Sequence, residues 1–94
     1  MFNIKIDDKG QVELIGRFDA SKLKTAKEVF DEIKDTTKVN FKQLYYISSA
    51  GLSILLLTQK RLKSEGKELL LFNMNDHLRE IFKYAGFDMI FKIE

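Results

Sequence analysis

The chain has 94 residues, 45% of them hydrophobic and eight of them Phe, which predicts one domain over residues 1–94 with a small core. Sixteen basic and fourteen acidic residues are spread along the chain, so its charge of +2 argues against a nucleic-acid partner, and the absence of Cys excludes thiolate catalysis and cysteine metal sites. No apolar run could span a bilayer and no signal region opens the chain, so we expect a cytoplasmic protein without membrane insertion.

The first half of the chain predicts two strands, a helix and a third strand. Apolar and polar residues alternate over 2–6, the turn "DDKG" follows, and "VELIG" completes an antiparallel pair. Apolar residues three and four positions apart predict a helix over 21–35, with Ser21 or Asp19 as its cap. The β-branched and aromatic residues of "KVNFKQLYYI", 38–47, predict the third strand.

The second half predicts two helices and two strands. After Ser49 the apolar rhythm is helical and ends at the glycine of "SEGK", and "ELLLF", 68–72, has the continuous apolar run of a central strand covered on both faces. Asn75 or Asp76 caps a third helix that stops at Gly86, and "MIFKI" is the last strand. The order β β α β α β α β predicts an α/β fold whose sheet is mostly parallel, with an antiparallel first strand.

Two pairs of apolar residues lie outside the simple core pattern. Ile54 and Leu57 exceed the core stripe of the second predicted helix, either as a contact for a partner or as part of a wide buried stripe, and we prefer the buried stripe. Phe87 and Met89 follow the third helix and are expected to close the core. Ala85 is expected on the buried face of that helix.

Candidate functional residues gather in "ISSAGL", where the third strand meets the second helix. Ser48 and Ser49 suit three roles, namely a helix cap, a nucleophile or a phosphate acceptor. A nucleophile is the least favoured role, because the single histidine, His77, lies on another predicted helix and no G-x-S-x-G elbow is present. A phosphoserine suits a helix N-terminus, whose amides and partial positive charge favour an anion. We therefore expect a protein that is not an enzyme.

Four stretches of the chain carry a family resemblance, "GRFDASKL", "YISSAGL", "KRLKSEGKELLL" and "LREIFKYAGFDMIFKI". In order and spacing they resemble the bacterial anti-sigma-factor antagonists, the stand-alone STAS domains, over about Ile4 to Ile93. The resemblance implies a STAS-type α/β domain that, when unphosphorylated, binds an anti-sigma factor with serine kinase activity and so releases a sigma factor. Phosphorylation reverses that choice. ATP belongs to the partner, so this chain is expected to need no cofactor and no metal.

The resemblance assigns the phosphorylation site. Aligned on Gly51, the phosphorylated residue is Ser49, with Ser48 as the second choice. The commonest motif of the family has Asp at the position of Ser48 and Ser or Thr at that of Ala50, so this chain carries a variant. The variant leaves an alternative function open, a STAS domain that is not phosphorylated and serves as a scaffold or regulatory subunit of a transport or signalling complex.

Four further residues are candidates for the acceptor loop or for contact with the partner. Asp19 matches the family's acidic residue after the second strand, near the acceptor loop, and alternatively caps the first helix. Asn40 matches an Asp or Asn at the end of the third strand, and we interpret it as an anchor for the loop. Tyr46 and Ser53 flank the acceptor and are candidates for partner contact.

Overall fold

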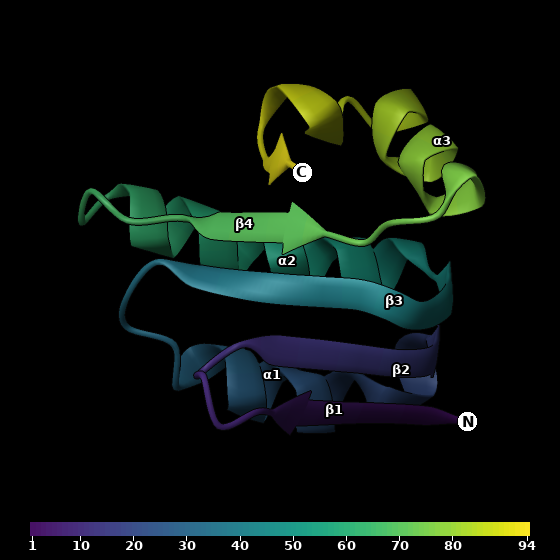
Figure 1. Cartoon of the computed structure of the whole chain (residues 1–94), viewed down its shortest axis with the longest axis horizontal. Coiled ribbons are helices and arrows are strands. Elements are labelled where there is room, and N and C mark those ends of the chain that lie inside the picture. The colour runs from purple at the N-terminus through teal and green to yellow at the C-terminus, as the bar shows by residue number, and fades with distance from the viewer.

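A computed structural model describes all residues, 1–94, and shows one five-stranded sheet with helices packed on one face (Figure 1). The strands are β1 (Phe2–Ile6), β2 (Val12–Phe18), β3 (Thr37–Ile47), β4 (Leu69–Phe72) and β5 (Lys92–Ile93). They lie in this order across the sheet, with β1 antiparallel to β2 and all other neighbours parallel. The predicted α/β fold and its antiparallel first strand are confirmed.

Three α-helices and two short 3₁₀ turns connect the strands. They are η1 (Ala20–Lys22), α1 (Leu23–Asp31), α2 (Ser49–Lys63), α3 (Asp76–Tyr84) and η2 (Phe87–Met89). In Figure 1, α1 and α2 lie behind the sheet, while α3 and the C-terminal segment lie beyond β4. Because β2 and β3 are parallel neighbours, their carboxyl ends lie side by side at one end of the sheet.

The core consists of large apolar side chains between the sheet and the helices. Four Phe rings are fully buried, and each contributes about 1.5–3 kcal/mol through its burial. The ring of Phe82 in α3 packs edge-on against Phe41 in β3, with the ring centroids 5.7 Å apart, and also contacts Phe87 and Phe91. This aromatic cluster fixes α3 and the C-terminal segment to the sheet.

The strand predicted to be covered on both faces is covered on one. Leu69 and Leu71 of β4 are buried, but Leu70 and Phe72 between them are only half-buried. The expectation is wrong because α1 and α2 occupy one face of the sheet and no helix crosses the other (Figure 1). A continuous apolar run fits such a strand because its outer residues still lose part of their surface to neighbouring side chains, as Phe72 does beneath the ammonium group of Lys38.

The bounds of the first helix and the turn after the third helix also differ from the prediction. The first helix ends at Asp31 rather than at residue 35, and its start is displaced by η1. After α3, Gly86 takes a left-handed φ of +75° and the amides of Ile90 and Phe91 both donate to the carbonyl of Phe87. This turn shortens the last strand and places Phe91, rather than Met89, in the core. Met89 is 88% exposed and Ala85 is also exposed, so both were wrongly expected to be buried.

Candidate functional site

Two loops meet where β2 and β3 end. The amide of Ser48 donates to the carbonyl oxygen of Phe18 at 2.9 Å, which joins the first residue after β3 to the last residue of β2. Asp19 follows Phe18 directly, so the structure places the loop before α1 beside the loop before α2. Asp19, Ser48 and Ser49 therefore lie at the same end of the sheet.

The two serines have different surroundings. Ser48 is the N-cap of α2, is half-buried, and its Oγ accepts a hydrogen bond from the amide of Gly51 at 3.2 Å. Ser49 is the first residue of the helix, is exposed, and its hydroxyl makes no hydrogen bond within the chain. The capping role belongs to Ser48, and the hydroxyl of Ser49 is free for chemistry.

Gly51 brings the first turn of α2 close to the sheet. It is buried, and a Cβ at this position would lie 2.9 Å from Cγ1 of Ile47 and 3.1 Å from Cγ of Phe18. Real Cβ atoms essentially never approach another atom to 2.9 Å, and 3.1 Å is a tight contact, so only glycine fits without displacement of these side chains. Gly51, a candidate residue of the acceptor loop, is therefore a packing residue that holds the first turn of α2 and with it Ser49.

Asp19 combines a capping role with its place beside the serines. One carboxylate oxygen accepts hydrogen bonds from the Ser21 hydroxyl at 2.6 Å and from the Ser21 amide at 3.1 Å. These two bonds, with a smaller contribution from the charge of Arg17, hold the pKa of Asp19 below its usual value of 3.8. Asp19 caps η1 rather than α1 and remains ionised at neutral pH.

Tyr46 and Ser53 lie on either side of the serines. The Arg17 guanidinium lies 4.1 Å from the centre of the half-buried Tyr46 ring and forms a cation–π contact with it. Arg17 was not among the residues predicted from the sequence. An Arg two residues before Asp19 was the available signal, because alternation puts both side chains on the same side of the strand end. Ser53 is exposed, one turn along α2, and its hydroxyl donates to the carbonyl of Ser49 at 3.0 Å.

The family resemblance predicted Asn40 at the end of the third strand, but Asn40 lies within β3. The strand continues to Ile47, and β3 bulges just after Asn40, where the pairing register with β2 shifts. The Asn40 Oδ1 atom accepts from the amide of Lys42 at 2.9 Å and from the side chain of Asn73 at 3.2 Å. Asn40 therefore anchors the bulge and the loop between β4 and α3, and it makes no hydrogen bond to the acceptor loop.

Leu57 is a further exposed residue on α2. It is 64% exposed, whereas Ile54 is half-buried and packs against the core, so the preferred interpretation of a wide buried stripe is wrong for Leu57. Ser49, Ser53 and Leu57 follow one another at intervals of four residues, which places them along one face of the helix.

Other kinds of site are not evident. No group of three or more His, Cys, Asp or Glu side chains is arranged to hold a metal ion. His77 is exposed on the first turn of α3, a different helix from that of the two serines, as predicted. None of the helices combines the length and the apolar character that crossing a membrane would require.

Sequence relatives of the chain are found among bacterial regulators. BtrV of Bordetella bronchiseptica, which its name describes as an anti-sigma factor antagonist, is 45% identical over 51 residues, 54% of this chain but only 44% of BtrV. The match thus spans less than half of that protein. The anti-sigma-B factor antagonist of Listeria monocytogenes is 29% identical over 82 residues, which cover 85% of this chain and 71% of the relative.

The fold is similar to that of a solved anti-sigma factor antagonist, SpoIIAA. Its unphosphorylated form has a TM-score of 0.75 and 18% identity, covering 100% of this chain and 88% of SpoIIAA. The phosphorylated form from Bacillus has a TM-score of 0.70 and 17% identity, and the match covers 100% of this chain and 91% of SpoIIAA. Identities this low carry the fold alone. The family model described as "Mlab, STAS domain" matches residues 4–93, nearly the whole chain. The chain therefore belongs to the STAS domain family.

Proposed function

We propose that this STAS domain is an anti-sigma-factor antagonist. It binds an anti-sigma factor through the surface around the first turns of α2, and phosphorylation of Ser49 ends that binding. The names of the two sequence relatives support the antagonist role. The observation that carries the switch is the division of roles between neighbouring serines, because Ser49 is exposed and unbonded while Ser48 caps the helix. Ser49 can thus accept a phosphoryl group without loss of the cap.

The charge of a phosphoserine explains how the surface changes while the fold remains. The phosphoryl group carries about −1.5 to −2 charges at neutral pH, and the positive end of α2 stabilises negative charge by about 0.3–1 kcal/mol. The carboxylate of Asp19 nearby opposes that gain. In the complex, the new dianion would have to lose water against the partner's surface, which is costly without a matching cation. The kinase and its ATP belong to the partner, and this chain performs no catalysis.

A second candidate function is a STAS subunit that is never phosphorylated, in a transport or signalling complex. The observation that favours it is the environment of the residues flanking Ser49. Ser48 is occupied as the helix cap, and Ala50 has no hydroxyl, so neither supplies the groups of the commonest phosphorylation motif. In that case Ser49 is a solvated residue of the first helical turn and its substitution leaves assembly unchanged.

The test is a capture experiment with immobilised wild-type, Ser49→Ala and Ser49→Asp proteins. Lysate of the native host is passed over each with ADP or ATP, and the retained proteins are identified by mass spectrometry. We expect the first two to retain an anti-sigma factor with serine kinase activity and Ser49→Asp to lose it. Gln11→Glu, which adds one negative charge at the opposite end of β2, serves as the control and should behave as wild type. Equal retention of transport or scaffold subunits by all variants would overturn the proposal.

A further inference from the structure

A groove runs between α1 and α2. It encloses about 190 Å³, and its apolar walls come from Phe30, Ile54 and Leu57. A second hollow is lined by Leu23, Lys24, Lys27, Ala50, Ser53 and Ile54. The two hollows share Lys27 and Ile54, so the groove extends from the middle of α2 toward the helix start, where Ser49 lies.

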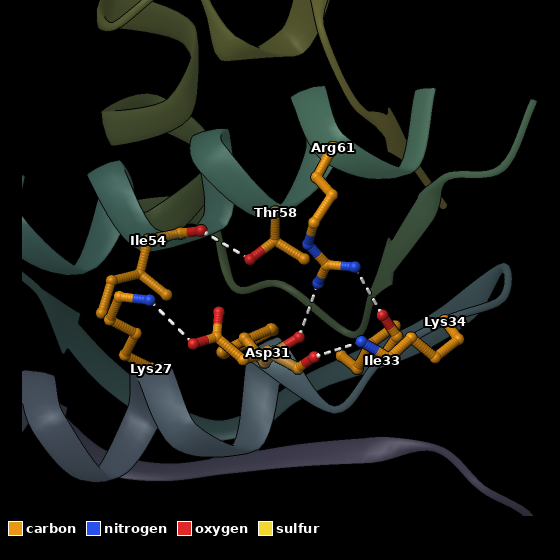
Figure 2. Close-up of polar contacts among 8 residues, drawn as sticks. Lys27, Asp31, Ile33, Lys34, Ile54, Thr58 and Arg61 are labelled. Carbon is orange, nitrogen blue, oxygen red and sulfur yellow. Dashed lines mark hydrogen bonds and ion pairs between the residues drawn. The ribbon is translucent and has the colours of Figure 1, made fainter. Parts of the chain in front are cut away.

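The polar groups inside the groove are already paired within the chain (Figure 2). The Thr58 hydroxyl donates to a carbonyl of its own helix at 2.8 Å. The Arg61 guanidinium donates to two carbonyl oxygens at the end of α1, at 2.8 and 2.9 Å. Lys27 and Asp31 form an ion pair of 2.7 Å. The groove therefore offers a ligand mainly apolar contact, which suits an aliphatic side chain better than a polar small molecule.

The groove is aligned with the acceptor serine. Ser49, Ser53 and Leu57 are all exposed and lie along one face of α2. The helix rises by eight residue steps from the first to the last, about 12 Å at 1.5 Å per residue. A protein seated over Ser49 needs only two helical turns to reach Leu57, and a segment of four or five extended residues spans that distance.

The charges around the groove are mostly positive. Lys24, Lys27 and Arg61 line the two hollows against a single carboxylate, that of Asp31, which Lys27 already neutralises. Lys24 forms no ion pair, and Arg61 keeps its charge while it donates to backbone carbonyls. The surplus positive charge favours an acidic occupant and disfavours a basic one.

We propose that the groove binds an acidic segment of the protein partner. One aliphatic side chain of that segment inserts between α1 and α2 against Leu57, and its carboxylates lie toward Lys24 and Arg61. The inference rests on the proposed function, because the segment belongs to the same anti-sigma factor that covers Ser49. It explains why an apolar side chain as large as Leu57 is left in water on the free domain.

The anti-sigma factor that immobilised wild-type protein retains is purified, and its affinity is measured for wild type and for three variants. Leu57→Ser should weaken binding about tenfold or more, as expected for a central apolar anchor. Lys24→Glu should weaken it mainly at low salt and reduce its salt dependence. Met89→Ser, which removes another exposed apolar side chain from η2, should bind as wild type. Circular dichroism melts should be unchanged for all three, since these side chains are exposed.

Each contrary outcome has its own meaning. If the anti-sigma factor binds Leu57→Ser and Met89→Ser with the same affinity as wild type, the groove inference is wrong and the proposed function stands. If wild type retains no anti-sigma factor, both fail. If sedimentation shows a wild-type dimer that Leu57→Ser dissociates, the groove belongs to a second copy of this chain, and the acidic segment is excluded.

Discussion

The two ends of α2 differ in what their side chains contact. At the N-terminal end Ser49 and Ser53 face solvent. Toward the C-terminal end Gln59 is 1% exposed, its Oε1 accepts from the amide of Leu69 at 2.8 Å, and its Nε2 donates to the carbonyl of Ile90 at 3.1 Å. This second end joins the helix to β4 and to the segment before β5, and Arg61 joins it to α1.

The difference explains how one helix can both hold the fold and display a switch. A change at the C-terminal end leaves buried polar groups without partners, which costs stability. A change at the exposed serines alters only the surface, because the cap of Ser48 and the close packing of Gly51 hold the first turn independently of them. Substitutions at the two ends of α2 should therefore differ in their effect on stability.

Gln59→Leu should have the largest effect. The side chain is of similar size, but the buried amide of Leu69 and the carbonyl of Ile90 lose their partners. We expect the free energy of unfolding to fall by about 2–4 kcal/mol. Urea denaturation followed by circular dichroism measures it, with Lys60→Gln on the exposed neighbouring position as the control. A Gln59→Leu protein as stable as wild type would remove the contrast between the two ends.

Gly51→Ala should be the next largest. Alanine favours the helix by about 1 kcal/mol over glycine, but its Cβ would press on Ile47 and Phe18, and such overpacking costs about 1–3 kcal/mol. We expect a net loss of up to about 2 kcal/mol in urea denaturation. The same substitution in a Phe18→Leu background should cost less, because the smaller side chain can yield. An equal cost in both backgrounds would mean that the contact with Phe18 does not decide the outcome.

Ser48→Ala and Ser49→Ala separate the cap from the acceptor. Removal of the Ser48 hydroxyl leaves the amide of Gly51 without its partner and should cost about 1 kcal/mol. Removal of the exposed Ser49 hydroxyl should change stability by less than about 0.5 kcal/mol. Thermal melts of the two variants beside wild type measure both. If Ser49→Ala is the more destabilised of the two, the assignment of the cap is wrong.

Local patterns in the sequence were sufficient for most of the fold. Alternation in β1 and the helical spacing in α1 and α3 record which side of each element faces the core, and glycines mark where helices stop. The bulges of β3 were not predictable, because they depend on the register with β2, whose paired residues lie more than twenty positions away in the sequence. For this reason the role of Asn40 was misplaced. The position of Met89 likewise depends on the hydrogen bonds of the turn after Gly86.

The site was predictable to within one residue. The strand-to-helix junction located Ser48 and Ser49, but which of them caps the helix depends on where the first turn begins, and sequence patterns define helix ends only to a residue or two. The exposure of Leu57 was not predictable from α2 alone. It depends on how closely α1 packs against its neighbour, and Leu57 lines an open groove with Lys27, Phe30 and Asp31 of that helix.

The smallest expected effect concerns Asp19, beside the N-terminal end of α2. Its pKa in the folded chain lies below 3.8, chiefly because Ser21 donates two hydrogen bonds to the carboxylate. A lowered folded pKa means that ionised Asp19 stabilises the fold above its unfolded pKa, and that this contribution is lost as the pH falls through the folded pKa. The carboxylate is exposed, so the change in stability is small. Ser21→Ala should raise the pKa of Asp19 toward its usual value in a carbon-13 NMR titration of the carboxyl group, while Ser53→Ala should leave it unchanged. An unchanged pKa in Ser21→Ala would instead assign the shift to the backbone amide and to Arg17, and the loop would then keep its charge whatever the side chain at position 21.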